Sequence, residues 1–396
     1  MVEDILDNKQ IRVALLSPGV TRKTAIAHFG ATFAKVMSRA VDLDYISEEA
    51  GEYEGLTFKP VLGFNPEKYD VVHFQWGNNP LHLFEFALLL RLTRCNSRPL
   101  IVSTLHEAEL GYLIGASAQA RRYRWFFRCR KGRGSPNDGT DYAFFSHYTV
   151  GEILNRSDWV IVHSEYAKRR IITEHQLRPS ESEKIQVARL GVNWNDYTLC
   201  REYGECSHTA DSDDPMVFLY VGSLYPVKSI DKIIKALHIV QCFARRDNFY
   251  LVVVGSGPEF DHLQFLAETL IPGRYCFAGN VPRVVPYYEL ADVVVCPRAF
   301  SRGEISGAIP EACAAGKPMI VPKIGGWNEY VDDSRGFPVA ADDEIDYAEA
   351  LLHCLENPSE LTEKGIQARH FAEQYLSWEK QKEIFISLYS QRPQKR

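Results

Sequence analysis

The sequence predicts an α/β protein built from two successive doubly wound units, each with a parallel sheet covered by helices. Three observations support this fold class. The chain has 396 residues, more than one hydrophobic core usually holds. Short apolar runs alternate with helical patterns, as is typical of parallel sheets covered on both faces. The alternation stops in a polar stretch at residues 196–215 and then restarts, which predicts a linker there.

Residues 1–195 predict the first Rossmann-like unit. Its expected strands lie at 11–17, 41–46, 71–76, 100–105 and 159–163, and its clearest helices at 25–37 and 81–92. Ser164 follows the last of these strands, and its hydroxyl suits the N-cap of another helix.

Residues 216–376 predict the second unit, with a similar succession of elements. We expect strands at 217–221, 250–254, 275–277, 293–296 and 319–321, and helices at 230–243, 259–270, 286–290 and from about 309. Residues 377–396 should form a C-terminal helix that crosses back to the first unit.

Composition excludes several classes of protein. With a net charge of −6, the chain has no global attraction for nucleic acid or anionic membranes, so any such surface must be local. The polar first ten residues do not resemble a secretory signal, and no apolar run is long enough to span a membrane. Nine cysteines without a Cys-x-x-Cys pair predict reduced thiols, no zinc site and a cytoplasmic location.

One segment, residues 296–317, has the features of a binding site. A strand ends there in a loop containing Ser306 and Gly307, and a helix follows, so free backbone N–H groups and the helix dipole can bind an anion. Glu304 and Glu311 add carboxylates that can accept hydrogen bonds from sugar hydroxyls. Alternatively, these acids only complement the helix dipole.

A second unusual segment, residues 121–133, holds seven basic and four aromatic residues and no acid. It could dock on an anionic membrane surface, giving peripheral contact at the inner membrane face, or bind an acceptor that carries phosphate. The alternative is a packed helix with a solvated basic face.

Several motifs occur in the order typical of retaining glycosyltransferases of the GT-B fold. They lie at 221–231, 254–258, 277–281 and 311–320, followed by Gly325, Gly326 and Glu329. The chain resembles the large family of group 1, or family 4-like, glycosyltransferases, strongly over residues 216–378 and more diffusely over 11–195. The specificity comes from the order and spacing of the motifs, since each one alone is weak.

The resemblance implies two Rossmann-like domains facing a cleft, and a transferase of EC class 2.4. Such an enzyme moves a sugar from a UDP or GDP sugar to a hydroxyl of a small molecule, glycan or glycolipid, with retention of configuration. It implies no cofactor and no obligatory metal. Two alternatives are a catalytically impaired nucleotide-sugar-binding or partner subunit, and a nicotinamide-dependent oxidoreductase. The oxidoreductase lacks support because no Gly-x-Gly-x-x-Gly follows the first strand.

By resemblance, Lys228 binds the donor diphosphate, where charge accumulates as the nucleotide departs. The family usually has an arginine where this chain has Ser223, so Arg298 or Arg302 is expected to substitute. Glu311 matches the glutamate that binds the ribose. The preceding glutamate of the family's pair would fall on Gly303, so we expect the adjacent Glu304 to serve.

The resemblance extends to backbone and first-domain groups. Ser306, Gly307 and Ala308 would present N–H groups to the diphosphate or sugar. Gly255 and Val281 belong to turns that enclose the base, and Gly19 to a loop that approaches the phosphates from the first domain. His106, at the end of a strand, resembles a catalytic histidine that lies against the donor sugar, whereas His73 is expected in the core.

Overall fold

The computed structural model describes residues 10–22, 24–92, 98–115, 140–193, 197 and 214–391. The predicted basic segment 121–133 and nearly all of the predicted linker 196–215 lie outside these residues. The chain divides into two compact units. The first contains residues up to 188, together with 302–304 and 381 onward, and the second contains 189–301 and 305–380. Three residues of a loop in the second half thus belong to the first unit.

The first unit contains an eight-stranded sheet with the order β3-β4-β2-β1-β5-β6-β7-β8. Every pairing is parallel except that of β3 with β4. The strands are β1 (Arg12–Leu16), β2 (Asp42–Ser47), β3 (Gly51–Tyr53), β4 (Leu56–Pro60), β5 (Val71–Trp76), β6 (Leu100–Leu105), β7 (Trp159–Val162) and β8 (Ile185–Val187).

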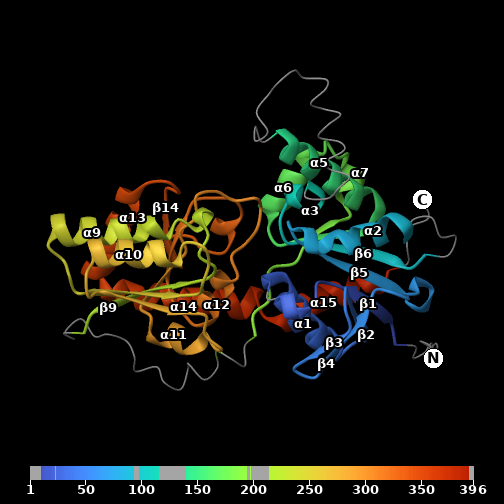
Figure 1. Ribbon diagram of the computed structural model, residues 1–396, viewed down its shortest axis with the longest axis horizontal. Helices are drawn as coiled ribbons and strands as arrows, with labels where there is room; N and C mark the ends of the chain where they lie inside the picture. Colours follow the sequence, from blue (N-terminus) through green and yellow to red (C-terminus); the bar gives the residue numbers. More distant parts are fainter. Residues whose placement is uncertain are drawn as a thin grey trace, which may run out of the picture. The chain divides into compact units, whose positions relative to one another are not determined.

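Helices cover both faces of this sheet (Figure 1). The α-helices are α1 (Ala25–Met37), α2 (Leu83–Leu92), α3 (Gly111–Gly115), α5 (Thr140–Arg156), α6 (Glu165–Glu174), α7 (Pro179–Ser182) and α15 (Trp378–Tyr389). Short 3-10 turns are η1 (Val20–Arg22), η2 (Pro66–Lys68) and η3 (Pro80–His82). Helices α2 and α5 pack on one face through a core that includes Phe86, Leu89 and Ile153. On the other face, the rings of Phe33 of α1 and Phe385 of α15 pack edge to face, with 4.7 Å between their centres.

The central strands of this unit and helices α1 and α2 were predicted, whereas the 17-residue helix α5 was not. Helix α1 has the predicted bounds, and the Thr24 side chain accepts a hydrogen bond from the N–H of Ala27. Ser164 caps α6 by accepting from the N–H of Ala167 at 3.1 Å, as expected. The prediction missed β3, β4 and β8. The first two form an edge hairpin whose side chains are mostly exposed, so they lack the continuous apolar run of a buried strand.

The second unit contains a six-stranded, fully parallel sheet with the order β11-β10-β9-β12-β13-β14. The strands are β9 (Met216–Val221), β10 (Phe249–Val254), β11 (Tyr275–Gly279), β12 (Val293–Val295), β13 (Met319–Pro322) and β14 (Gly336–Val339). Strand β14 was not predicted. It is a four-residue edge strand that contains Pro338, and proline is tolerated at a sheet edge because no ladder hydrogen bond needs its nitrogen.

Helices also lie on both faces of the second sheet, with α9, α10 and α13 on one side and α11, α12 and α14 on the other (Figure 1). They are α9 (Ile230–Ile239), α10 (Phe260–Leu270), α11 (Val285–Leu290), α12 (Ala308–Ala314), α13 (Glu344–Glu356) and α14 (Pro358–Tyr375). The 3-10 turns are η5 (Pro226–Lys228) and η7 (Trp327–Glu329). The predicted helix 230–243 is α9 followed by a π-helical turn, η6 (Val240–Ala244).

The strand orders place the predicted loops at topological switch points. In the first sheet, β1 has β2 and β5 as neighbours, and the chain crosses from one side to the other there. In the second sheet, β9 lies between β10 and β12 in the same way. Ligands of open α/β sheets bind at the carboxyl ends of such strands. The loops after β1, β9 and β12, which carry Gly19, Lys228 and Arg298, therefore lie where this rule expects a site.

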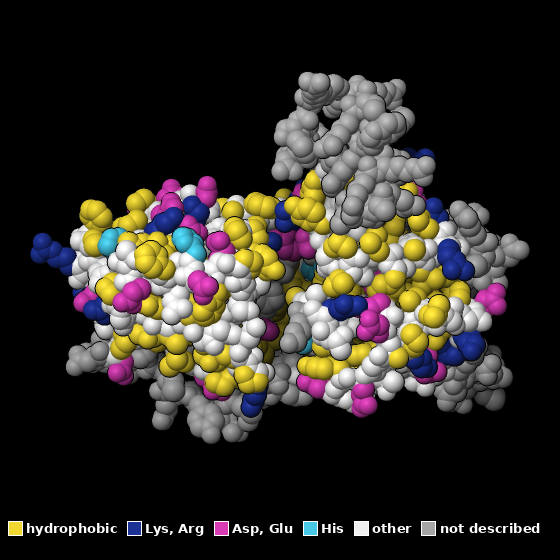
Figure 2. All heavy atoms as spheres, viewed as in Figure 1, with side chains coloured by type: hydrophobic (Ala, Val, Ile, Leu, Met, Phe, Trp, Pro, Cys, Tyr) yellow, Lys and Arg dark blue, Asp and Glu magenta, His cyan; other side chains and the backbone are white. Residues whose placement is uncertain are grey.

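The coloured residues on the face drawn in Figure 2 show no sign of a large charged surface that would bind nucleic acid or a membrane. Basic and acidic side chains are interspersed with hydrophobic ones on both units, without a broad area of one charge sign among the residues coloured there. None of the helices in the described part of the chain combines the length and the apolar character that crossing a bilayer needs.

Candidate active site

In the second unit, the loops after β9, β10 and β11 pack backbone against backbone. The N–H of Gly222 donates to the carbonyl of Val254 at 2.9 Å, and that of Gly255 to the carbonyl of Gly279 at 2.8 Å. Gly255 has a φ of 135°, and a Cβ on it would lie 1.8 Å from the carbonyl oxygen of Gly222. Only glycine fits there. Val281 lies two residues beyond Gly279, so both predicted base-side residues belong to this group of loops.

Gly255→Ala is expected to lower the free energy of unfolding of the second unit by about 2–4 kcal/mol, because both the backbone angle and the contact disfavour a side chain. Urea unfolding measures the loss. Gly273→Ala is the matched control, since Gly273 also has a positive φ, 72°, but no atom lies within 4 Å of the position that its Cβ would take. Equal losses in the two variants would show that backbone strain, not the contact with Gly222, sets the cost.

Lys228 ends the 3-10 turn η5, just beyond the carboxyl end of β9. Its side chain is half-buried. The next residue, Ser229, has a left-handed backbone with a φ of 51°, which turns the chain into α9. The turn is tied to the loop after β12, because the N–H of Ala299 donates to the carbonyl of Val227 at 3.1 Å. This bond holds the backbone beside Lys228 close to that beside Arg298.

Glu311 lies in the first turn of α12, and its carboxylate accepts a hydrogen bond from the hydroxyl of the buried Tyr288 at 2.9 Å. Burial raises the pKa of the Cys296 thiol, directly after β12, to about 12. The charge of Lys228 lowers this pKa and that of Glu311 raises it. Both charges therefore act at the same strand end. We call Lys228, Arg298 and Glu311 the β12 cluster.

Arg298 is the buried member of the β12 cluster, with 6% of its surface exposed. Its Nε donates to the carbonyl of Phe300 at 3.0 Å, and its guanidinium carbon lies 6.0 Å from the centre of the Trp327 ring. Ser223 is exposed, and its carbonyl accepts from the hydroxyl of Tyr220 at 2.9 Å. The second unit thus has a second cation at the strand end, although Ser223 itself carries no charge.

The remaining predicted residues of this unit surround the start of α12. Helix α12 begins at Ala308, which is buried, after the exposed Gly307. The carbonyl of Ser306 accepts from the N–H of Ile309 at 3.0 Å. Glu311 is three residues beyond Ala308. The structure therefore places Ser306, Gly307 and Ala308 in one short turn with Glu311, as their proximity in sequence requires.

In the first unit, His106 follows β6 and is held by a chain of polar groups. Its Nδ1 lies 3.0 Å from Nε2 of His163, and Nδ1 of His163 lies 2.8 Å from the carbonyl oxygen of Ala188. Its Nε2 lies 2.8 Å from the side-chain amide of Gln75. The ring of Phe29 packs edge-on against it at 4.7 Å. Both ring nitrogens of His106 therefore have partners inside the protein.

This chain of contacts fixes which nitrogens carry hydrogen. Burial lowers the pKa of His163 to about 4 and that of His106 well below its usual value, so both rings are neutral at pH 7. A carbonyl only accepts, so His163 donates from Nδ1 to Ala188 and accepts at Nε2 from Nδ1 of His106. Nε2 of His106 must then accept, which requires the Gln75 amide to be turned by 180° so that its NH₂ group replaces the Oε1 that lies 2.8 Å from this nitrogen. His106 is consequently not set up as an acid or base.

Gln75 also connects to His73, which is fully buried as expected. Its Nδ1 lies 2.6 Å from the hydroxyl of Tyr389, and its Nε2 lies 2.8 Å from Oγ1 of Thr104. The chain of polar groups thus runs from α15 through β5 and β6 to the loop after β8. Gln75 and His163 carry only a weak signal in the sequence, since each lies at or just after the end of a buried strand.

Glu304 lies in the first unit together with His106, because residues 302–304 belong there. The N–H of Ala108 donates to the carbonyl of Arg302 at 2.8 Å. The N–H of Arg302 donates to the Glu304 carboxylate at 2.6 Å. Gly303 has a φ of 89°, and a Cβ on it would lie 2.7 Å from Cβ of Ala108. The turn thus favours glycine at 303, the position where the family spacing would place a glutamate, and the carboxylate next to it is that of Glu304.

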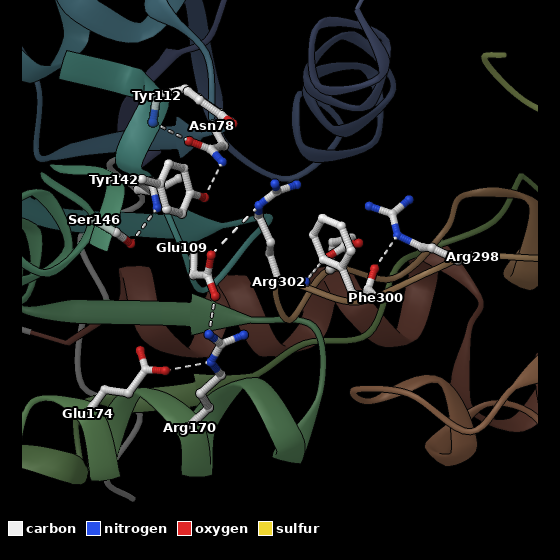
Figure 3. Close-up of polar contacts among 12 residues, drawn as sticks. Asn78, Glu109, Tyr112, Tyr142, Ser146, Arg170, Glu174, Arg298, Phe300 and Arg302 are labelled. Atoms are coloured by element: carbon white, nitrogen blue, oxygen red, sulfur yellow. Dashed lines mark hydrogen bonds and ion pairs between the residues drawn. The ribbon is translucent and has the colours of Figure 1, made fainter. Parts of the chain in front are cut away.

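A further group of residues in the first unit was missed by sequence reasoning. Arg302 pairs with Glu109, with 3.7 Å between Nε and Oε2, and Glu109 also pairs with Arg170 of α6 (Figure 3). The guanidinium carbon of Arg302 lies 5.8 Å from the ring centre of Tyr112 and 5.5 Å from that of Tyr142. These contacts commit Arg302 to the first unit, so of the two candidate substitutes for the missing arginine only Arg298 lies in the β12 cluster.

Gly19 lies at the carboxyl end of β1, as expected, but its N–H donates to the Glu48 carboxylate at 3.1 Å. Nε of Arg22 donates to the other oxygen of the same carboxylate at 2.6 Å. A carboxylate just after β2 thus accepts from the N–H of Gly19, the residue that was predicted to approach a phosphate. Among the described residues, no group of three or more potential ligands could hold a metal ion.

The structure therefore distributes the predicted residues over the two units. It places His106 and Glu304 in the first unit, in segments joined by the bond between Ala108 and Arg302, with Gly19 at a separate strand end. It brings Lys228, Arg298 and Glu311 together in the second. The remaining residues of the second unit, Ser223, Gly255, Val281, Ser306, Gly307 and Ala308, lie in loops at the same edge of its sheet.

Comparison with known proteins also finds similarity to glycosyltransferases in the second unit. A family described as "Glycosyl transferases group 1" matches residues 215–357. D-inositol 3-phosphate glycosyltransferase 2 of Catenulispora acidiphila is 31% identical over 241 residues, which is 57% of this chain and 55% of that protein. An uncharacterized glycosyltransferase of Methanocaldococcus jannaschii is also 31% identical, over 38% of this chain and 39% of its own length. The chain thus spans about half the length of the first of these curated relatives and less than half of the second.

Solved structures match over nearly the whole chain. Sucrose-phosphate synthase from Thermosynechococcus elongatus superposes with a TM-score of 0.72 at 17% identity, covering 96% of this chain and 98% of that one. HepE from Anabaena superposes with a TM-score of 0.68 at 16% identity, covering 96% and 99%. The predicted fold class is confirmed, since the chain has the GT-B fold of two Rossmann-like domains, and the family resemblance is confirmed in that residues 215–357 match the group 1 glycosyltransferase family.

Proposed function

We propose that the protein is a glycosyltransferase that moves a sugar from a nucleoside diphosphate sugar to an acceptor hydroxyl, with retention of configuration. The observation that supports this most is the β12 cluster. Two cations and a carboxylate gather at the end of one strand, inside the segment that matches group 1 glycosyltransferases. Cations there suit a departing diphosphate, and a carboxylate suits the hydroxyls of a ribose.

Within this proposal, each member of the β12 cluster has a separate task. Lys228 stabilises the negative charge that develops on the diphosphate, and the buried Arg298 adds positive potential at the same strand end. Glu311, oriented by the Tyr288 hydroxyl, accepts hydrogen bonds from the ribose. The close-packed loops at Gly255 and Val281 offer a rigid wall of backbone groups for the base.

In the first unit, Glu304 binds hydroxyls of the transferred sugar and His106 forms a neutral wall beside them. Since both nitrogens of His106 bond to the protein, it supplies shape rather than proton transfer. The proton of the acceptor hydroxyl then passes to the departing phosphate, which is itself a plausible base. Catalysis would rest mainly on positioning and on stabilisation of leaving-group charge.

The comparisons suggest which substrates to test first. HepE was solved with UDP-glucose and with UDP and glucose, so uridine nucleotides are the first donors to test, followed by GDP sugars. The curated relatives named D-inositol 3-phosphate glycosyltransferases make phosphorylated polyols the first acceptors to test. The basic segment 121–133 remains a candidate contact for such a phosphate or for a membrane surface.

A second candidate is a nucleotide-sugar-binding subunit without transferase activity. Ser223 favours it, because an exposed, uncharged residue stands where the family usually has an arginine. Arg298 in the β12 cluster argues against it, since a cation is present nearby. Both candidates predict that the protein binds a nucleotide sugar, but only the transferase predicts turnover.

A panel of UDP, GDP and ADP in a thermal-shift assay tests binding, and nucleotide release from the corresponding sugars tests turnover. We expect UDP or GDP to raise the melting temperature most, because a ligand of the folded state stabilises it by mass action. We expect release of the same nucleotide to increase when an acceptor is added. A large shift without release, across varied acceptors, would favour the binding subunit. No shift with any nucleotide would contradict both candidates.

A further inference from the structure

The side chain of Arg302 is held by residues of the first unit (Figure 3). Its guanidinium carbon lies 5.8 Å and 5.5 Å from the ring centres of Tyr112 and Tyr142. Its Nε lies 3.7 Å from a carboxylate oxygen of Glu109. Arginine is suited to this setting, because its planar cation can lie against aromatic rings and face a carboxylate simultaneously. We call Glu109, Tyr112 and Tyr142 the Arg302 cage.

The Arg302 cage is itself fixed by other residues. The side chain of Asn78 bridges its two tyrosines, donating to the hydroxyl of Tyr142 at 2.8 Å and accepting from the N–H of Tyr112 at 2.8 Å. Glu109 is also paired with Arg170. The cage thus has a defined geometry within the first unit.

The backbone of Arg302 connects the cage to Glu304. Its N–H donates to the Glu304 carboxylate at 2.6 Å, and its carbonyl accepts from the N–H of Ala108 at 2.8 Å. Glu304 is 8% exposed, so its carboxylate has little room to move. A side chain that anchors Arg302 therefore also sets the position of that carboxylate relative to the loop of His106.

We propose that Arg302 is a positioning residue that acts through Glu304, and that the Arg302 cage thereby governs recognition of the transferred sugar but not of the nucleotide. This rests on the proposed function, which assigns the sugar to Glu304 and the nucleotide to the β12 cluster. The cage belongs to the first unit, whereas Lys228 and Glu311 belong to the second, so loss of the cage leaves nucleotide binding intact. In this chain, the Arg302 cage rather than the family's usual spacing between its two glutamates places the Glu304 carboxylate.

The test compares UDP and UDP-glucose binding by calorimetry in the wild type, Arg302→Met, Glu304→Gln and the double variant. We expect Arg302→Met to weaken UDP-glucose binding about tenfold or more while UDP binding changes less than about twofold, since a displaced contact loses most of its contribution. We expect the double variant to bind UDP-glucose no more weakly than Glu304→Gln, because residues that act as one unit are non-additive. Arg302→Lys should be as defective as Arg302→Met, because lysine lacks the planar group.

Two control variants separate positioning from general damage. Tyr142→Phe keeps the ring beside Arg302 and should retain most UDP-glucose affinity, whereas Tyr142→Leu should resemble Arg302→Met. Arg178→Met removes an exposed arginine of the same unit that pairs with Glu181, and this variant should bind like the wild type.

Additive losses in the double variant, or equal losses of UDP and UDP-glucose affinity in Arg302→Met, would overturn the inference. Equal affinity of the wild type for UDP and UDP-glucose would overturn it as well, because no sugar recognition would exist for the cage to govern. Turnover of the wild type is measured separately. Binding that follows the expected pattern without turnover would contradict the proposed transferase and leave this inference standing.

Discussion

Lys228→Ala is expected to abolish the thermal shift produced by UDP or GDP and to lower kcat/KM by about 10²–10³-fold. The loss is large because a preorganised cation at a developing diphosphate charge acts more strongly in the transition state than in the ground state. Lys228 ends η5, and the bond between Ala299 and Val227 fixes that turn, so alanine should remove the charge without moving the loop. Differential scanning fluorimetry and steady-state kinetics measure the two effects.

Lys235→Ala provides the matched control. Lys235 lies on α9, next to the same loop in sequence, and pairs with Asp231 at 2.7 Å on a partly exposed surface. An exposed pair of this kind contributes about 0.3–0.5 kcal/mol, so the control should bind nucleotide like the wild type. If Lys228→Ala retains the full nucleotide shift, Lys228 does not belong to the binding site.

The central strands were predictable because they are continuous apolar runs, and helix α6 because Ser164 marks its start, whereas the long helices α5, α13 and α14 were not predicted. Helix α1 and strands β5 and β6 have the bounds that the sequence predicted. Edge elements were missed for a physical reason. The hairpin β3 and β4 and the proline-containing β14 bury little surface, so their sequences lack the hydrophobic pattern on which the predictions depend.

The candidate site residues of the second unit could also be identified from the sequence, because they lie on short loops between recognisable strands. Lys228 and Glu311 each follow a motif closely, and the parallel sheet brings their loops to one edge. Their roles in binding remain predictions. Of the two arginines that the sequence offered as substitutes, Arg298 is the one at this strand end, where it is the second cation beside Lys228.

The contacts around the candidate site residues of the first unit could not be predicted from the local sequence pattern. The contact of Ala108 with Arg302 joins residues far apart in sequence, and nothing near either residue signals it. The same holds for Glu109, which the sequence analysis did not single out but which pairs with two arginines in the structure. Long-range polar contacts depend on the finished fold, whereas sequence motifs report only local geometry.

The buried histidines of the first unit predict that it loses stability as the pH falls below about 6.5. Burial lowers the pKa of His73 to about 3 and that of His163 to about 4, and lowers that of His106 well below its usual value. In the unfolded chain each titrates near 6.5, so the unfolded state binds more protons at acidic pH and is favoured there. Each such histidine lowers the free energy of unfolding by about 2 kcal/mol between pH 7 and pH 5.

His73→Gln isolates one of these contributions. Other groups titrate in the same range, and Glu85, whose pKa burial raises to about 7, acts in the opposite direction. The decisive quantity is therefore the difference between variant and wild type, in which those groups cancel. That difference should shift by about 2 kcal/mol in favour of the variant between pH 7 and pH 5, whatever its value at pH 7.

Urea unfolding followed by hydrogen exchange in peptides from β5 and β6 assigns the effect to the first unit, which matters because a chain of two units need not unfold in one step. His262→Gln is the control, since His262 is exposed on α10 of the second unit. A pH-independent difference between His73→Gln and the wild type would mean that His73 takes up a proton as readily in the folded protein as in the unfolded chain, so that burial does not hold it neutral.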